Sequence, residues 1–350
     1  MVHNRGGSTG FSVLNVRVKL AALAVAVLAF VPAGASAQRA VFVGENDGLV
    51  PYSDRDYTGG FRASLVFDDL KRTLAGGFFG FVSPALITAG APAGPVRQQV
   101  EWIYFGESIF TPSRPTSPVR APGDRPFGGW LYNGFSISQE SNRQQLDTFE
   151  VLAGVVGPAA QGAEIQGLIH RIIGQPPPVV NNYQIQNEPG VAVSWERRWK
   201  FGTEFGDRFG FDVIPSVGVT AGNVFTYASA GAVARIGRSL GTTWGPTLVR
   251  PSVSGASFIS PDPQGPYFGF DFFAGVEGRA VARNIFLDGN SFVSSPRVTK
   301  NPFVFDLVAG AELFTQTGHR LAFTVVRRSP EYTTQGAASI FASAEASVKF

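Results

Sequence analysis

The first candidate for chemistry is a segment rich in oxygen ligands, residues 43–60. It contains Glu45, Asn46, Asp47, Asp54 and Asp56, with Thr58 just before a Gly-Gly pair. A turn that ends a strand needs only one Asn or Asp. Side-chain oxygens of these types are also the ligands that Ca²⁺ prefers. The spacing does not match an EF-hand loop, so the residues alone leave an Asx-type turn and a cation site as alternatives.

Histidine supplies the second candidate. The chain has three: His3 falls in a segment that we expect to be removed, and His319 lies in the turn sequence Gln-Thr-Gly-His-Arg. A neutral imidazole takes a proton from water near neutral pH, so His170 is a candidate general base. The alternative is a helix histidine that hydrogen-bonds a nearby carbonyl group.

His170 lies in a segment with helical spacing. The apolar positions that set this spacing are Ile165, Leu168, Ile169 and Ile172. Pro158 suits the first turn of a helix, and Gly174 suits its end. We therefore predict a short helix near residues 158–173, with Gln166 one turn before His170 on the same face.

A histidine base and a bound Ca²⁺ would together suffice for ester hydrolysis. The histidine activates a water molecule, and the ion polarises the ester carbonyl and stabilises the oxyanion that forms. This chemistry needs no serine nucleophile, and the sequence contains no Gly-x-Ser-x-Gly elbow.

The N-terminus predicts export from the cytoplasm. A basic region precedes an apolar run at residues 20–31, and an Ala-Ser-Ala cleavage signature ends at position 37. The apolar run is too short to span a bilayer comfortably. We expect residues 1–37 to be a signal peptide and residues 38–350 to form the mature domain.

Composition narrows the class of the mature protein. The chain has no cysteine, so an exported fold must be stabilised by its core or by sheet closure. No later segment is apolar enough for a transmembrane helix. The net charge of +3 is too small to indicate a nucleic-acid partner.

The dominant pattern in the mature chain has a period of two. In residues 339–350 one face carries Ile340, Ala342, Ala344, Ala346, Val348 and Phe350, and the other carries Ser343, Glu345, Ser347 and Lys349. Residues 267–280 and 303–313 also combine an apolar face with a face that carries charges. Long strands with charges on the second face suit a wet lumen better than a dry core.

Twelve segments carry this alternation, and bacterial barrels have an even number of strands. They are residues 39–45, 60–67, 98–106, 129–138, 146–155, 191–199, 211–221, 225–236, 267–280, 303–313, 321–327 and 339–350. The terminal Phe350 resembles the assembly signal of outer-membrane barrels. We predict an all-β fold, a single closed antiparallel transmembrane β-barrel of about 12 strands with one helical insertion. The barrel-assembly machinery would insert it into the bacterial outer membrane.

Five blocks follow one another along the mature chain. They are Glu45-Asn46-Asp47, residues 54–60, residues 109–112 with 123–131, residues 157–174 with Gln166 and His170, and residues 184–188. In order and rough spacing, these blocks resemble the outer-membrane lipid A 3′-O-deacylases, the LpxR family. The resemblance covers most of the mature chain, and its strength comes from the order of the blocks.

The resemblance implies Ca²⁺-dependent removal of the 3′-linked acyloxyacyl group from lipid A, at a site near the outer-leaflet side of a twelve-stranded barrel. His170 matches the catalytic base of the family, and Thr58 matches its active-site threonine. Asn46 and Asp47 match its Asn-Asp pair. Lipid A within lipopolysaccharide is then the expected partner, and Ca²⁺ the expected cofactor.

For other residues of these blocks the resemblance implies less specific roles. Asp47, Glu164 and Glu188 are the expected metal ligands, and Gln166 is an expected substrate contact; Glu164, Gln166 and Glu188 can serve either the metal or the imidazole. The family also has a basic residue after its Thr-Pro block, where this chain has no lysine. Arg114 or Arg120 is expected to replace it by pairing with a lipid A phosphate.

Three alternatives remain open from the sequence. The missing lysine allows a passive outer-membrane channel or structural barrel with a degenerate site. The same histidine and Ca²⁺ chemistry would serve an outer-membrane phospholipase. A soluble periplasmic sandwich would also carry a period-two pattern.

Overall fold

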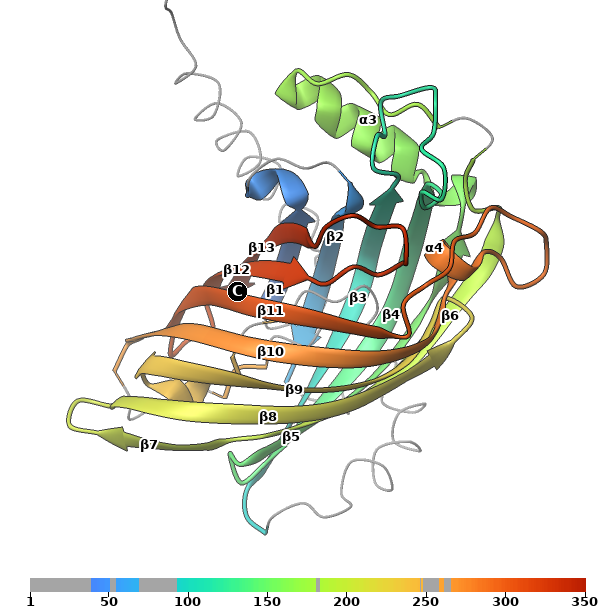
Figure 1. Ribbon diagram of the computed structural model, residues 1–350. Helices are drawn as coiled ribbons and strands as arrows, with labels where there is room; N and C mark the ends of the chain where they lie inside the picture. Colours follow the sequence, from blue (N-terminus) through green and yellow to red (C-terminus); the bar gives the residue numbers. More distant parts are fainter. Residues whose placement is uncertain are drawn as a thin grey trace, which may run out of the picture.

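The strands of the protein form one closed antiparallel sheet. The computed structural model describes residues 39–50, 55–68, 93–180, 183–245, 247, 258–260 and 266–350. β1 (Arg39–Asn46) pairs with β13 (Ser339–Lys349), and β6 (Glu188–Trp199) pairs with β8 (Phe209–Gly222), so the sheet closes on itself (Figure 1). The predicted signal peptide and Asp54 lie outside the described residues.

Twelve strands close the barrel, and the short β7 (Phe201–Phe205) pairs only with β8. The remaining strands are β2 (Asp56–Phe67), β3 (Val96–Thr111), β4 (Gly128–Ser141), β5 (Gln145–Val156), β9 (Phe225–Arg238), β10 (Phe268–Asn284), β11 (Phe303–Thr315) and β12 (Arg320–Arg328). The predicted fold class and strand number are therefore confirmed. β7 was not predicted, and β2 and β3 extend further than the sequence pattern indicated.

The two faces of each strand follow the predicted alternation. In β13, Glu345 points into the lumen and pairs with Arg320 at 3.4 Å, whereas Ala344 is exposed on the outside. On β10 and β11 the outward phenylalanines Phe272 and Phe305 are exposed. An outward apolar belt of this kind is what a transmembrane barrel presents to lipid. Among the described residues, no helix is long and apolar enough to cross a membrane.

Paired charges fill the lumen. Asp306 accepts hydrogen bonds from the guanidinium groups of both Arg279 and Arg328, at 2.9–3.1 Å. Arg320 also pairs with Glu312 at 3.0 Å. Buried charges need such partners, because an unpaired ion in a dry interior is very costly. The wet lumen expected from the sequence is thus occupied by ion pairs.

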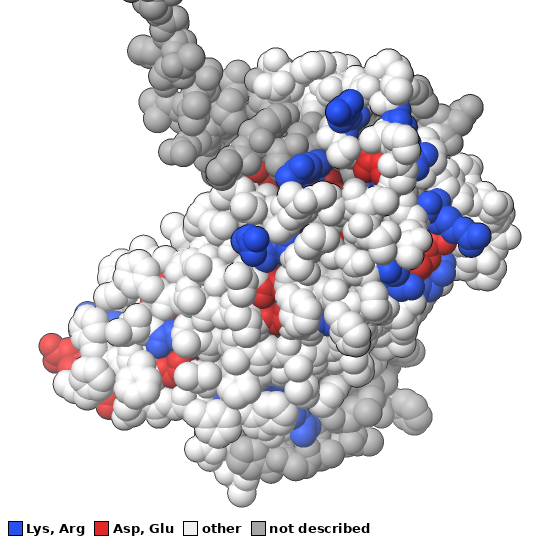
Figure 2. Space-filling view, viewed as in Figure 1, with Lys and Arg blue, Asp and Glu red and all other residues white. Residues whose placement is uncertain are grey.

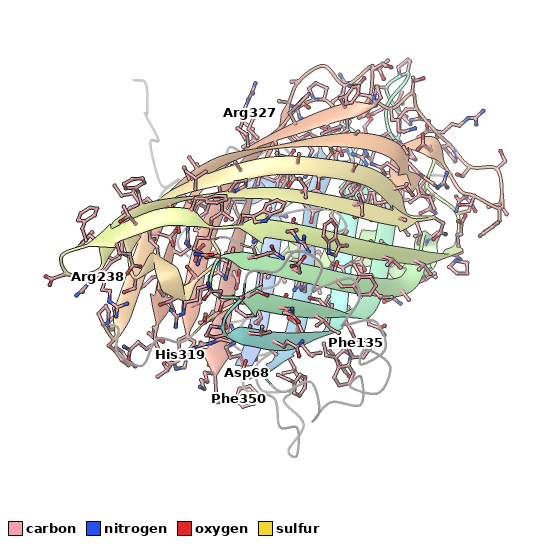
Figure 3. The ribbon with its side chains drawn as sticks, turned by 90° about the horizontal axis from the view of Figure 1, so that it is seen from below. Asp68, Phe135, Arg238, His319, Arg327 and Phe350 are labelled. Carbon is pink, nitrogen blue, oxygen red and sulfur yellow. The ribbon has the colours of Figure 1, made fainter. Side chains whose placement is uncertain are left out.

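A segment between β9 and β10 enters the lumen at the end where β1 begins and β13 finishes. Trp244 Nε1 donates to Glu140 Oε1 at 2.7 Å, and Gly245 O accepts from Arg320 Nη2 at 2.9 Å. Gln99 Nε2 donates to Ile259 O at 2.9 Å. In Figure 3, which shows the molecule from below, many side chains lie between the strands of the barrel.

The opposite end of the barrel, here called the distal end, is closed by an aromatic core. Its largest members are Tyr57, Phe110, Trp130, Phe225, Phe286 and Phe341. Phe286 comes from the short helix α4 (Ile285–Asp288) and stacks on Phe110 with ring centroids 4.0 Å apart. The distal end also carries the short 3₁₀ helix η1 (Asp47–Leu49) and the helix α3 (Gly162–Ile173) (Figure 1).

The helical insertion begins later than predicted. Pro158 opens a 3₁₀ turn, and Gln161 then takes a left-handed conformation with φ 60° before α3 begins at Gly162. The helix ends as predicted, because Gly174 has φ 77° and caps it. Three prolines, residues 176–178, follow and prevent the helix from continuing.

Candidate active site

The predicted site residues of β1 and β2 lie at the distal end, on or beside the outer wall of the barrel. Arg62 and Glu45 belong to the lumen side, so the alternation of β1 turns the next residue, Asn46, outward. Asn46 pairs across the sheet with Gly59, which in turn pairs with Ile109 on β3. This row of outward positions is where the barrel wall could meet a lipid.

Asn46 and Asp47 are held by their own turn. Asn46 Oδ1 accepts from Gly48 N at 2.7 Å, and its amide nitrogen donates to Thr58 O at 3.1 Å. The Asp47 side chain is buried, and its Oδ2 accepts from Arg55 N at 2.8 Å. The Asx turn expected as one alternative is thus present. It also fixes an amide and a carboxylate beside Thr58.

Thr58 occupies a β-bulge, where the pairing of β2 with β3 shifts register between Tyr57 and Gly59. Its hydroxyl lies 2.5 Å from the hydroxyl of Thr111, the last residue of β3, and both side chains are buried. A bulge re-aims a side chain relative to the regular pleat. Thr58 therefore lies beside Asn46 on the outer side, whereas Tyr57 points into the aromatic core.

α3 packs against the outer wall through glycine. A Cβ on Gly162 would come within 3.2 Å of Gly129 Cα on β4 and 3.3 Å of Glu107 Oε1 on β3. Because neither Gly162 nor Gly129 has a side chain, the first turn of α3 can lie directly against the strands. The residues one and two turns later, Gln166 and His170, are buried on the same face of the helix.

The opposite face of α3 is exposed and carries both apolar and charged side chains. Leu168 is 50 % exposed, and Ile172 is 38 % exposed. Gln166 and His170 face the wall, whereas Leu168 and Ile172 point outward together with the exposed charged residues Glu164 and Arg171. This arrangement suits a helix whose outer surroundings are lipid.

His170 has one ring nitrogen fixed by the chain that follows the helix. His170 Nδ1 lies 2.5 Å from Pro176 O, and a carbonyl oxygen only accepts hydrogen bonds, so Nδ1 carries the proton. In the neutral ring Nε2 then carries a lone pair, as a general base requires. The hydrogen bond from a helix histidine to a nearby carbonyl group, expected as the alternative to a general base, is therefore present. It is compatible with a role as a base, because Nε2 remains the basic atom.

Glu107 was not predicted, although it lies beneath α3. Its carboxylate is 1 % exposed, and neither oxygen has a hydrogen-bond partner. Counting by two from Glu101 places Glu107 in the lumen, but the pairing of β3 with β4 shifts between Ile103 and Gly106. That bulge turns Glu107 outward, under the N-terminal turn of α3.

Comparisons with known proteins show the family to which this chain belongs. The profile of the family described as outer membrane protein LpxR matches residues 20–350. This chain belongs to the LpxR family. The solved structure of LpxR from Salmonella typhimurium is similar with a TM-score of 0.70 and 22% sequence identity, over 89% of this chain and 100% of that one.

Other matches add little to this assignment. The β domain of the Bordetella autotransporter BrkA gives a TM-score of 0.44 at 9% identity, over 90% of this chain and 98% of that one. No curated protein matches the sequence. Family and fold together make this an outer-membrane β-barrel protein.

The three metal ligands expected from the resemblance to the LpxR family are not brought together. Glu164 is exposed on α3, and Glu188 accepts from Asn223, Asn290 and Ser291 at 2.7–3.1 Å. In the described part of the chain, no three acidic or histidine side chains form a metal site. Of the three, only Asp47 is a buried carboxylate beside Asn46 and Thr58.

The two arginines expected to bind phosphate differ in their surroundings. Arg120 donates from Nη2 to Asp124 O at 2.6 Å, and its guanidinium lies over the ring of Tyr183. Arg114 is exposed in the same loop between β3 and β4. That loop is joined to the segment after α3, since Val179 N donates to Pro115 O at 2.7 Å.

A buried polar cluster fixes the loops around the site. The Tyr332 hydroxyl lies 3.2 Å from Asp56 Oδ1 and 3.1 Å from Asp124 Oδ1, so it links β2 to the β3–β4 loop. Burial, together with the Asp56 carboxylate, holds the pKa of Tyr332 well above its usual value, so the phenol keeps its proton. Ser339 Oγ also donates to Asp56 Oδ2 at 3.1 Å.

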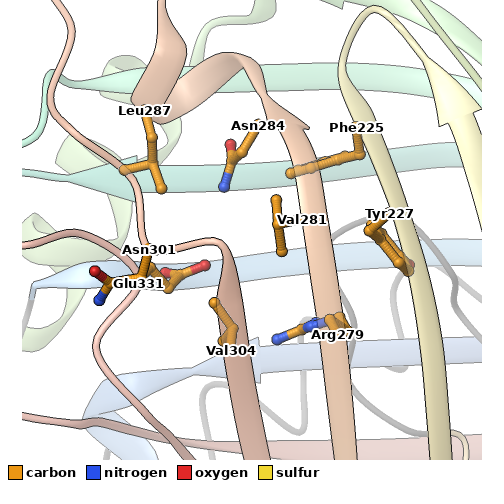
Figure 4. Close-up of a pocket in the computed structure, with 9 residues that line it drawn as sticks. All are labelled: Phe225, Tyr227, Arg279, Val281, Asn284, Leu287, Asn301, Val304 and Glu331. Atoms are coloured by element: carbon orange, nitrogen blue, oxygen red, sulfur yellow. The ribbon is translucent and has the colours of Figure 1, made fainter.

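A separate small pocket lies inside the lumen. Its lining residues are Phe225, Tyr227, Arg279, Val281, Asn284, Leu287, Asn301, Val304 and Glu331 (Figure 4). Arg279 is already paired with Asp306. The pocket contains none of the predicted site residues, and we assign it no part in the chemistry.

Proposed function

We propose that the protein hydrolyses the 3′-linked acyloxyacyl ester of lipid A in the outer leaflet. One observation carries the proposal: the wall-facing side of α3 buries His170 with Nδ1 held by Pro176. That helix covers the distal part of the outer wall, on which Asn46 and Thr58 also lie. A hydrolase for membrane lipids needs its site on the lipid side of the wall, and this site does not open into the filled lumen.

The reaction proceeds by attack of water. Nε2 of His170 takes a proton from a water molecule as the water oxygen bonds to the ester carbonyl carbon. The tetrahedral intermediate then collapses, the bond to the sugar oxygen breaks, and the imidazolium returns its proton to that oxygen. The Nδ1 proton donated to Pro176 O keeps the ring oriented throughout.

Negative charge develops on the carbonyl oxygen during attack. The amide nitrogen of Asn46 has a second N–H beyond the one donated to Thr58 O, and it can donate to this oxyanion. The hydroxyls of Thr58 and Thr111 can also donate, because each is a donor and an acceptor.

The donor set beside Asn46 suits a hard cation in part. Asp47 would hold Ca²⁺ with hydroxyl and carbonyl oxygens of its surroundings, since Ca²⁺ accepts such mixed oxygen ligands. Glu164 and Glu188 do not fit, because the first is exposed and the second is fully engaged elsewhere. When bound, Ca²⁺ would supply positive charge at the oxyanion.

An outer-membrane phospholipase is the second candidate, because this chemistry serves any ester near the outer leaflet. The passive channel is disfavoured by the lumen, where ion pairs, the aromatic core and the Trp244 segment leave little room for ions. The closed barrel of the LpxR family rules out the soluble sandwich.

The decisive experiment is mass spectrometry of lipid A from cells that express the protein or its His170→Ala variant, with and without added Ca²⁺. We expect loss of one acyloxyacyl group only with intact His170 and with Ca²⁺. Release of fatty acid from phospholipid, with unchanged lipid A, would favour the phospholipase. Unchanged lipids in every sample, with the barrel correctly inserted, would contradict both.

A further inference from the structure

Arginines without a protein partner gather at the distal end. In the described part of the chain, lumen arginines such as Arg235 and Arg328 pair with carboxylates at 2.5–2.9 Å. Among the arginines that the structure describes, the guanidinium groups that make no hydrogen bond or ion pair are those of Arg55, Arg114, Arg171, Arg297 and Arg327, all at the distal end. Figure 2 likewise shows most Lys and Arg of this face toward the end with α3.

Arg55 is tied to the proposed site through its backbone. Its backbone N–H donates to Asp47 Oδ2 at 2.8 Å, and Thr58 follows three residues later. The side chain is partly buried, and its Nε is buried without a hydrogen-bond partner. A guanidinium that is partly removed from water and lacks an anion is incomplete until an anion binds.

Arg327 lies two strands from the site on the same outer wall. Its neighbour Arg328 pairs with Asp306 in the lumen, so the alternation of β12 turns Arg327 outward. Arg327 pairs across the sheet with Ile340 on β13, the strand that also contacts η1. Two strand spacings make about 10 Å, and Figure 3 shows Arg327 projecting away from the barrel.

The proposed substrate carries an anion next to its scissile bond. In the distal sugar of lipid A, the 3′ ester and the 4′ phosphate occupy neighbouring ring carbons. An ester held at Asn46 and His170 therefore brings a phosphate monoester close to the same residues. Arginine suits phosphate because its planar guanidinium donates two parallel hydrogen bonds to it.

We propose that Arg55 binds the phosphate monoester beside the scissile ester, with Arg327 as a second, outer cation. This assignment rests on the proposed function and names the part of the substrate that is recognised. It also supplies a cation where the Thr-Pro block lacks a lysine, since Arg120 is already engaged with Asp124 and Tyr183.

Binding tests the assignment without depending on turnover. The purified His170→Ala barrel in detergent is titrated with lipid A that carries or lacks the 4′ phosphate, and Arg55→Ala is added to the same background. We expect Arg55→Ala to weaken binding of the phosphorylated lipid about 10-fold, the size of one lost charge-assisted contact. Binding of the dephosphorylated lipid should change less than about 2-fold, since that lipid never makes the contact.

Matched variants complete the test. Arg297→Ala removes another unpaired arginine, from the loop between β10 and β11, and should leave both affinities unchanged; Arg327→Ala should weaken the phosphorylated lipid about 3-fold, as an exposed contact does. Arg55→Lys should recover part of the loss, because it restores charge without the planar fork. Equal losses on both lipids would overturn the assignment, because Arg55 would then act through the fold.

Two further outcomes separate the possible failures. Micelles of phosphatidylglycerol, a phosphodiester, should not compete, and Arg55-dependent competition by them at equal concentration would overturn the monoester preference. If the wild-type protein releases no acyl group while Arg55-dependent binding persists, the proposed reaction fails and the phosphate site stands.

Discussion

The lumen and the outer wall beneath α3 treat charge in opposite ways. In the lumen Asp306 has two arginine partners, and Arg320 has two glutamates. Beneath α3, Glu107 is equally buried and has no partner at all. A buried charge that has a partner loses less free energy on leaving water, whereas a buried carboxyl group without a partner keeps the full cost of its burial.

The difference teaches where to look for function in this barrel. The many charged residues inside the lumen resemble a channel lining in the sequence, yet their mutual pairing makes them structural. The less conspicuous row of Asn46, Thr58 and Thr111 on the outer side carries the hydrogen-bond donors and acceptors of the proposed site.

The largest effect is expected from a substitution at the outer wall, in the proposed active site. His170→Ala should lower the rate of lipid A deacylation about 10²–10⁴-fold, because a positioned general base contributes that much. The measurement is initial rate on purified lipid A in detergent micelles. His319→Ala, in the turn between β11 and β12, is the control and should retain full activity.

Breaking a lumen ion pair should affect stability and spare the chemistry. Asp306→Ala leaves Arg279 and Arg328 without their shared carboxylate and should cost about 3–5 kcal/mol of unfolding free energy. Urea unfolding in detergent measures it. Asp288→Ala, which breaks a partly exposed pair with Lys300, should cost at most about 1 kcal/mol. A large loss of activity per folded Asp306→Ala molecule would contradict the view that the lumen charges serve stability and the outer wall serves the chemistry.

A methyl group beneath α3 should disturb the site more than the fold. Gly162→Ala would press on Gly129 at 3.2 Å and should shift the first turn, at a cost of about 1–3 kcal/mol. We expect reduced deacylation, measured as above. Gly167→Ala meets only Pro177 and Pro178 at 3.8–3.9 Å, and should stabilise α3 by up to about 1 kcal/mol. Equal activity in the two variants would count against a tightly docked helix.

The smallest expected effect concerns Glu107. Replacing it with Gln keeps the shape and removes a buried carboxyl group that has no partner, so the melting temperature in detergent should change little, by the equivalent of at most about 1 kcal/mol. Activity should stay near that of the wild type. Loss of activity in a well-folded Glu107→Gln barrel would instead place this carboxylate in the reaction.

The sequence predicted the features that depend on local pattern. The faces of β13 and the end of α3 at Gly174 follow from alternation and capping, which act over a few residues. The missed features depend on register. Glu107 faces outward because of a bulge in β3, and a count by two cannot find a bulge.

Tertiary partners decided the rest of the site. The order of the blocks predicted Glu188 as a metal ligand, but Asn290 and Ser291, about a hundred residues away, donate hydrogen bonds to its carboxylate. Arg55 could not be singled out from the sequence, because only the folded structure shows that its side chain has no acidic partner. The site roles themselves stay predictions until the variants are measured.

The two outward apolar side chains of α3 also bear on when the proposed site could form. In water Leu168 and Ile172 would be driven inward, toward the positions that Gln166 and His170 occupy in the finished barrel. A surrounding of hydrocarbon removes that competition. A chain crossing the periplasm would therefore lack an ordered α3, and any activity that depends on His170 would require insertion into the membrane.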